Sequence, residues 1–164
     1  MKALTFMLAL LGGAPSLTGD VKPFVRGSWQ QLRGAHAGQP LVVHFWGVTC
    51  APCMVELPNW GQLQRERPNA RIVFVAADPV PVERPQIEAA ISKARIGSGE
   101  NWMFADVFGE RLRYEVNPTW AGELPYTAII GRDGKASFVS GVTDLRTIRA
   151  WLDQQASATG KARR

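Results

Sequence analysis

The sequence predicts an α/β fold in which a central mixed β-sheet is flanked by helices. Two apolar runs, at 41–46 and 71–76, each have the length and composition of a strand that is buried on both faces. A helical pattern follows each run, and this order of elements is typical of a parallel βαβ unit. An Asp133-Gly134 turn between two further strand-like segments indicates an antiparallel hairpin, which makes the sheet mixed.

The other elements follow along the chain without an internal repeat or a low-complexity tract. From Cys53 onward, apolar residues recur at helical spacing, Pro58 is expected to kink this helix, and Arg-Pro-Asn at 67–69 ends it. Apolar residues within 87–94 predict a second helix. After a short segment at 102–108, the hairpin joins strands at 124–130 and 136–140.

Asp144 is expected to cap a final amphipathic helix. The apolar face of this helix carries Leu145, Ile148, Trp151 and Leu152. Four tryptophans are interpreted as core or groove aromatics with no assigned chemistry: Trp29, Trp102, Trp120 and Trp151.

The chain has the size and composition of one globular domain. Its 164 residues are 46% hydrophobic and 20% charged, which is enough to bury a core without disulfide staples. The formal net charge is +5, but no basic patch with interleaved aromatics lies inside the domain, so nucleic-acid binding is not expected. We place a monomeric domain at 20–156 and a basic flexible tail at 157–164.

The first 19 residues have the pattern of a signal peptide or an N-terminal membrane anchor. Lys2 precedes an apolar run at 3–11, and small residues follow at 12–14. The run is shorter than the roughly 20 apolar residues of a spanning helix, which favours cleavage within 14–19. A buried N-terminal strand or helix is the alternative. The favoured interpretation places the domain in the periplasm, soluble or anchored.

The two cysteines are spaced as C-x-x-C at the junction of a strand and a helix. There, unpaired backbone N–H groups and the positive end of the helix dipole stabilise a thiolate. Cys50 is therefore expected to be the attacking nucleophile and Cys53 to resolve the mixed disulfide. Pro52 fits the first helical turn and stiffens it. An exported domain held together by disulfides would contain several pairs, so this single pair is not interpreted as a staple.

Other uses of a C-x-x-C pair can be compared with this one. Haem attachment requires histidine after the second cysteine, where this chain has Met54, and a structural zinc site requires two more ligands. Two thiolates with His44 or His36 could hold a cuprous ion, so a periplasmic copper carrier is the alternative function. The favoured redox function needs no metal and no other cofactor.

Residues 44–58 read His-Phe-Trp-Gly-Val-Thr-Cys-Ala-Pro-Cys-Met-Val-Glu-Leu-Pro. This segment resembles the active-site segment of the TlpA-like (ResA/DsbE-type), cytochrome-maturation branch of thioredoxins. The resemblance extends through Leu124-Pro125 and Asp133-Gly134 and covers about 27–155. It implies a thioredoxin-like fold and a thiol:disulfide oxidoreductase that reduces protein substrates such as apocytochromes. A membrane electron donor would keep its dithiol reduced.

The resemblance also implies roles for residues around the dithiol. Pro125 would be cis and pack beside the cysteines, while the Leu124 backbone pairs with a substrate strand. A trans proline that begins a strand is the alternative. Glu56 lies where this branch carries an active-site acid, one helical turn beyond Cys53, and could accept the proton of that thiol. The alternative for Glu56 is a solvated helix carboxylate.

Two positions depart from the family pattern. His44 occupies an inward position where thioredoxins carry aspartate or a neutral residue. It is expected to be a buried, neutral histidine that tunes the redox potential. Glu56 is favoured as the acceptor of the Cys53 proton, and His44 is the alternative acceptor. Thr49 replaces the tryptophan common before the first cysteine, which alters the side chain that flanks the docking groove.

Overall fold

Six strands form one mixed sheet within residues 20–162, which the computed structural model describes; the predicted signal peptide or anchor at 1–19 lies outside the described residues. The order across the sheet is β1-β4-β3-β2-β5-β6. The strands are β1 Val21–Phe24, β2 Leu41–Trp46, β3 Arg71–Ala76, β4 Glu100–Phe104, β5 Tyr126–Ile130 and β6 Ala136–Ser140. The helices are α1 Ser28–Ala35, α2 Ala51–Glu66, α3 Arg84–Ala94, α4 Gly109–Val116 and α5 Leu145–Ala162.

The strand pairing confirms both the predicted βαβ unit and the predicted hairpin. β2 lies parallel to β3 and antiparallel to β5, and β5 pairs antiparallel with β6. In the hairpin turn, the Gly131 amide donates to the Lys135 carbonyl at 3.0 Å, and Gly134 has a φ of +76°. A residue with a side chain would be strained at that φ, so glycine is needed there.

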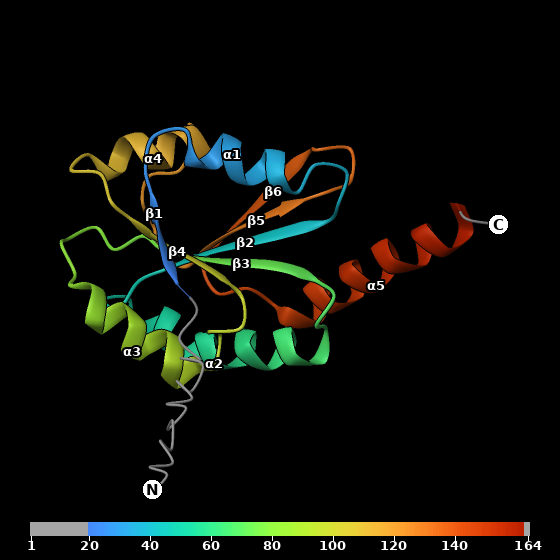
Figure 1. The fold of residues 1–164 in the computed structure, drawn as a ribbon, viewed down its shortest axis with the longest axis horizontal. Helices are drawn as coiled ribbons and strands as arrows, with labels where there is room; N and C mark the ends of the chain where they lie inside the picture. The colour runs from blue at the N-terminus through green and yellow to red at the C-terminus, as the bar shows by residue number, and fades with distance from the viewer. Residues whose placement is uncertain (1–19, 163–164) are drawn as a thin grey trace, which may run out of the picture.

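The helices form two layers on the sheet (Figure 1): α1 and α4 cover one face, while α2 and α3 cover the other, with α5 packed beside α2. Side chains alternate along β2, as they must in any strand. Val43 and Phe45 therefore join the core under α1 and α4, whereas Val42 and Trp46 join the core under α2 and α3. The same alternation directs His44 toward α2.

The sequence interpretation leaves out three short elements: β1, α1 and α4. β1 has four residues, of which one is Pro23, and each short helix buries only two or three side chains. Such segments carry too few apolar positions for a periodic pattern. The segment at 102–108, left without assigned structure, contains the end of β4 and the loop that follows it.

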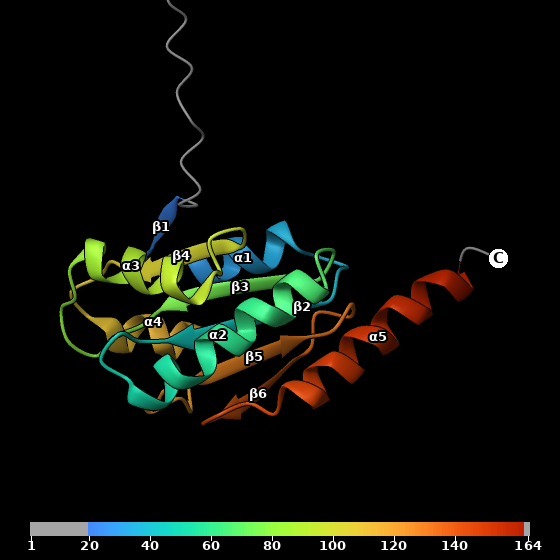
Figure 2. The same ribbon diagram turned by 90° about the horizontal axis from the view of Figure 1, so that it is seen from below.

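α5 begins immediately after Asp144, whose carboxylate accepts the backbone N–H of Arg146 at 3.0 Å, as a capping residue should. The helix continues past residue 156 to Ala162 and projects away from the sheet toward its C-terminal end (Figure 2). Two of its side chains are buried in the core, Ile148 and Leu152. Among residues 20–162, no helix has the length and apolar character needed to cross a membrane.

Gly61 allows α2 and α3 to approach closely. A Cβ atom at this position would overlap the carbonyl oxygen of Ala94, the last residue of α3. We expect Gly61→Ala to lower the free energy of unfolding by about 1–3 kcal/mol, because a backbone atom cannot move aside cheaply. Urea denaturation would measure the change.

Gly34→Ala in α1 is the matched control. Its added Cβ meets nothing within 4 Å, so alanine should stabilise the protein by up to about 1 kcal/mol. Equal effects of the two substitutions would contradict this account.

Candidate functional site

The Cys50–Cys53 pair lies where β2 leads into α2, and the two cysteines form a disulfide with Cα atoms 5.2 Å apart. Cys50 is the N-cap of α2, and its Sγ accepts the backbone N–H of Cys53 at 3.3 Å. Pro52 occupies the first turn of the helix, where no intrahelical donor is lost. Cys50 is partly exposed, whereas Cys53 is completely buried. A partner could therefore approach Cys50 but not Cys53.

The segment before β5 lies beside the loop that leads to Cys50. The Leu124–Pro125 peptide bond is cis, as the family resemblance implies. β2 and β5 pair antiparallel, with Phe45 opposite Tyr126, the first residue of β5. The residues just before β5 therefore lie alongside Trp46 and the loop that follows it. A Cβ at Gly47 would lie 3.2 Å from the Leu124 side chain. The two residues that the sequence assigns to substrate binding thus lie next to the dithiol segment.

Asp78 holds the loop before Cys50, and the sequence interpretation did not single it out. Its carboxylate accepts the backbone N–H of Val48 at 3.1 Å and both the N–H and the hydroxyl of Thr49 at 2.8 Å. A Cβ at Gly47 would come within 2.7 Å of the Asp78 carboxylate, so a larger residue at this position would displace that carboxylate from its present place. One available signal was the position of Asp78, which follows β3 at the sheet edge that also carries Cys50.

A buried polar network lies between β2, β5 and α2. The His44 Nδ1 atom is 3.0 Å from the Thr127 hydroxyl, which is 2.9 Å from the Thr143 hydroxyl. On the other side of the ring, His44 Nε2 is 3.2 Å from the Glu56 Oε1 atom, although the two groups are not aligned as a regular hydrogen bond. The Thr143 amide donates to Glu56 Oε2 at 3.1 Å. The His44 ring also lies 4.4 Å from that of Trp60, measured between centroids.

Burial sets the protonation of this pair. Complete burial lowers the pKa of His44 to about 3, so the imidazole is neutral at physiological pH. Burial raises the pKa of Glu56, and the Thr143 amide and the Trp60 side chain partly oppose that shift. Glu56 is only 5% exposed, which contradicts the alternative of a solvated helix carboxylate. The structure therefore brings together a neutral histidine and a carboxyl group that titrates closer to neutrality than usual.

The described residues contain no group of three or more His, Cys, Asp or Glu side chains placed to hold a metal ion. The two histidines considered for a cuprous site are engaged elsewhere. His44 lies in the buried network, and His36 follows α1, with its Nε2 atom 3.2 Å from Glu100. The copper-carrier alternative gains no support from this arrangement.

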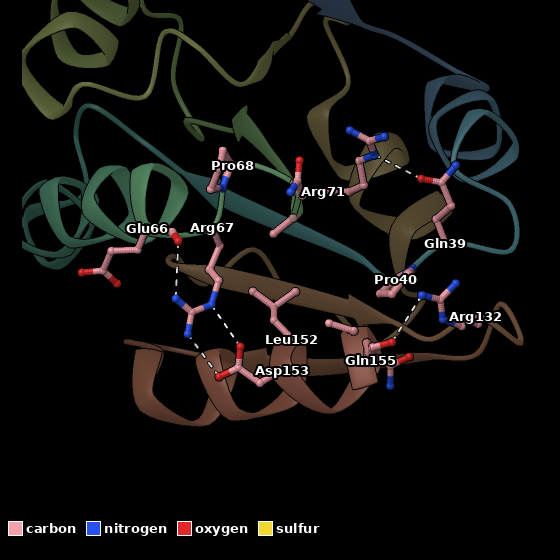
Figure 3. A pocket seen from close by; sticks show the side chains of 13 residues that line it. Gln39, Pro40, Glu66, Arg67, Pro68, Arg71, Arg132, Leu152, Asp153 and Gln155 are labelled. Atoms are coloured by element: carbon pink, nitrogen blue, oxygen red, sulfur yellow. Dashed lines mark hydrogen bonds and ion pairs between the residues drawn. The ribbon is translucent and has the colours of Figure 1, made fainter. Parts of the chain in front are cut away.

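Two cavities differ in their position relative to the dithiol. One of about 610 Å³ lies between the end of α2 and α5 (Figure 3). There, Arg67 forms two hydrogen bonds with Asp153. Because α2 has 16 residues, this cavity is about 24 Å along the helix from Cys50. The other, of about 470 Å³, is lined by Asp78 and lies at the same sheet edge as Cys50. Asp78 links the second cavity to the loop before Cys50, because its carboxylate accepts hydrogen bonds from Val48 and Thr49.

Comparisons with known proteins identify the fold. No protein-family model and no curated protein sequence matches this chain. Solved structures do match: a secreted disulfide oxidoreductase of Mycobacterium tuberculosis is 24% identical, with a TM-score of 0.53 over 67% of this chain and 75% of that one. StoA from Bacillus subtilis is 21% identical, with a TM-score of 0.55 over 71% and 84%. A thiol:disulfide interchange protein of the thioredoxin family from Chlorobium tepidum is 18% identical, with a TM-score of 0.60 over 74% and 83%. These likenesses show a thioredoxin-like fold.

Proposed function

We propose that this thioredoxin-like chain is an extracytoplasmic thiol:disulfide oxidoreductase of the TlpA-like type. The observation that carries the proposal is the unequal exposure of two paired cysteines at a helix N-terminus. Cys50 is accessible and receives an N–H at its sulfur, while Cys53 is buried directly behind it. This is the arrangement that a nucleophilic and a resolving thiol require.

The reaction proceeds in two exchanges. In the reduced protein, the Cys50 thiolate attacks a substrate disulfide, a mixed disulfide forms, and one substrate thiolate leaves. The Cys53 thiol then gives up its proton, and its thiolate attacks the Cys50 sulfur. This second attack closes the Cys50–Cys53 disulfide and releases the second substrate thiolate. Two electrons from a reduced donor return the protein to the dithiol form.

We assign the carboxylate of Glu56 as the acceptor of the Cys53 proton. The two residues are three apart on α2 and share one face of the helix. The raised pKa of Glu56 supports this role, because a base works best when its pKa is near the operating pH. The lowered pKa of His44 makes its imidazole a poor proton acceptor by comparison. The His44 Nε2 atom lies 3.2 Å from the Glu56 carboxylate on the side of β2.

Substrates, donor and compartment follow from the family resemblance. Cysteines of apocytochromes c or of another exported redox protein are the proposed substrates, and a membrane protein is the proposed electron donor. A substrate strand would pair with the backbone of Leu124 beside Pro125. The export pattern at 1–19 and the likeness to a secreted oxidoreductase support a periplasmic location. The protein is proposed to act as a monomer.

A redox titration tests the function directly. Purified protein is equilibrated with glutathione buffers of graded ratio, and free thiols are counted after acid quenching. We expect reversible two-electron exchange at Cys50 and Cys53, with a potential nearer the roughly −270 mV of thioredoxin than the roughly −120 mV of a strong oxidant. A pair that resists reduction would show a structural disulfide instead. Stoichiometric cuprous-ion binding that blocks all exchange would favour a copper carrier.

A further inference from the structure

Asp78 contacts Thr49, the residue that immediately precedes the proposed nucleophile Cys50. Its carboxylate accepts three hydrogen bonds, two of which come from the residue that precedes Cys50. Among the side chains of residues 20–158, no lysine or arginine forms an ion pair with Asp78. The other charged residues that line its cavity are Asp106, Glu110 and Arg113. The Asp78 carboxylate is thus held against Thr49, the residue immediately before Cys50.

We propose that Asp78 is a positioning residue that holds the Cys50 loop and makes the dithiol more strongly reducing. This inference rests on the proposed redox function. The Cys53 amide donates to the Cys50 sulfur in the disulfide form, and the same amide and the N-terminus of α2 would stabilise a Cys50 thiolate in the reduced protein. A carboxylate beside the thiolate opposes that stabilisation. A less stable thiolate means a less stable reduced form, so the equilibrium moves toward the disulfide and the protein donates electrons more readily.

Asp78 could act on Cys50 in two ways: its hydrogen bonds hold the loop in place, and its carboxylate adds a negative charge. Substitutions can separate these two effects. Asp78→Asn removes the charge but keeps the shape of the side chain. Thr49→Val removes one donor to the carboxylate but leaves its charge in place. If charge sets the potential, only the first substitution should favour the dithiol form. If the loop geometry alone mattered, both substitutions should move the equilibrium in the same direction.

The experiment measures the equilibrium constant with glutathione and the pH dependence of Cys50 alkylation for each variant. We expect Asp78→Asn to shift the equilibrium about three- to tenfold toward the dithiol, or roughly 15–30 mV, and to lower the pKa of Cys50. Thr49→Val should produce no shift toward the dithiol. Asp106→Asn is the matched control, because Asp106 lines the same cavity and contacts the Phe108 amide instead of the active-site loop. It should change the equilibrium less than twofold.

Asp78→Ser provides a second uncharged variant if Asp78→Asn does not fold, and the same shift is expected from it. An unchanged equilibrium in a folded Asp78 variant, or an equal shift in Thr49→Val, would overturn the inference. Absence of exchange with glutathione in the wild-type protein would instead overturn the proposed function. The two failures are therefore distinguishable.

Discussion

Replacing Cys50 with serine is expected to abolish thiol–disulfide exchange completely. Cys50 is the partly exposed sulfur of the pair, and the remaining Cys53 is buried without access to a partner. Cys53→Ser should instead stop the reaction halfway, because Cys50 can still attack but nothing releases the mixed disulfide. Incubation of each variant with a disulfide-bonded protein, followed by non-reducing electrophoresis, measures the trapped species. The Cys53 variant should accumulate them, and the Cys50 variant should not.

Selective alkylation gives an independent check of these roles. At mildly acidic pH, iodoacetamide should label Cys50 of the reduced protein well before Cys53, since the helix N-terminus favours the Cys50 thiolate. Peptide mass mapping identifies the labelled position. Preferential labelling of Cys53, or mixed disulfides trapped in the Cys50→Ser protein, would reverse the assignment.

Glu56→Gln is expected to slow the release of the mixed disulfide by about ten- to a hundredfold. In the wild-type protein, the rate of this step should rise with pH as the Glu56 carboxyl loses its proton. That rise should occur above the ordinary range of a glutamate, because burial raises the pKa of Glu56. The glutamine variant retains the shape of the side chain but cannot accept the proton, so this part of the pH profile should disappear. Stopped-flow measurement of product release between pH 4.5 and 8, roughly the range around a perturbed carboxyl group, follows the change.

His44→Asn is the matched comparison, since it alters the same network from the strand side. We expect it to shift the redox potential more than the rate and to leave the pH profile of release in place. The reason is that a histidine with a pKa of about 3 does not titrate in the working range. A lost pH dependence in His44→Asn together with a silent Glu56→Gln would identify His44 as the base.

Local pattern predicts the parts of the site that are contiguous in sequence. The apolar run of β2, the cysteines and the start of α2 are adjacent along the chain, so their relative placement follows from the strand-to-helix order. Long-range pairing determines the rest. Thr127 faces His44 only because β5 pairs with β2 in one register, and Asp78 reaches Thr49 across 29 positions of sequence. Neither contact leaves a periodic signal in the sequence.

The histidine beneath the dithiol also limits how much charge the interior must carry. An aspartate at position 44 would place a second carboxyl group near that of Glu56, and two neighbouring like charges in a core oppose each other's ionisation. A neutral imidazole removes that conflict, and its single proton can reside on either nitrogen, facing Thr127 or facing Glu56. The His44 imidazole can thus face either the protonated or the ionised carboxyl group of Glu56 and remain neutral in both cases. In the proposed mechanism, Glu56 is the only one of these two residues whose charge changes as the dithiol cycles.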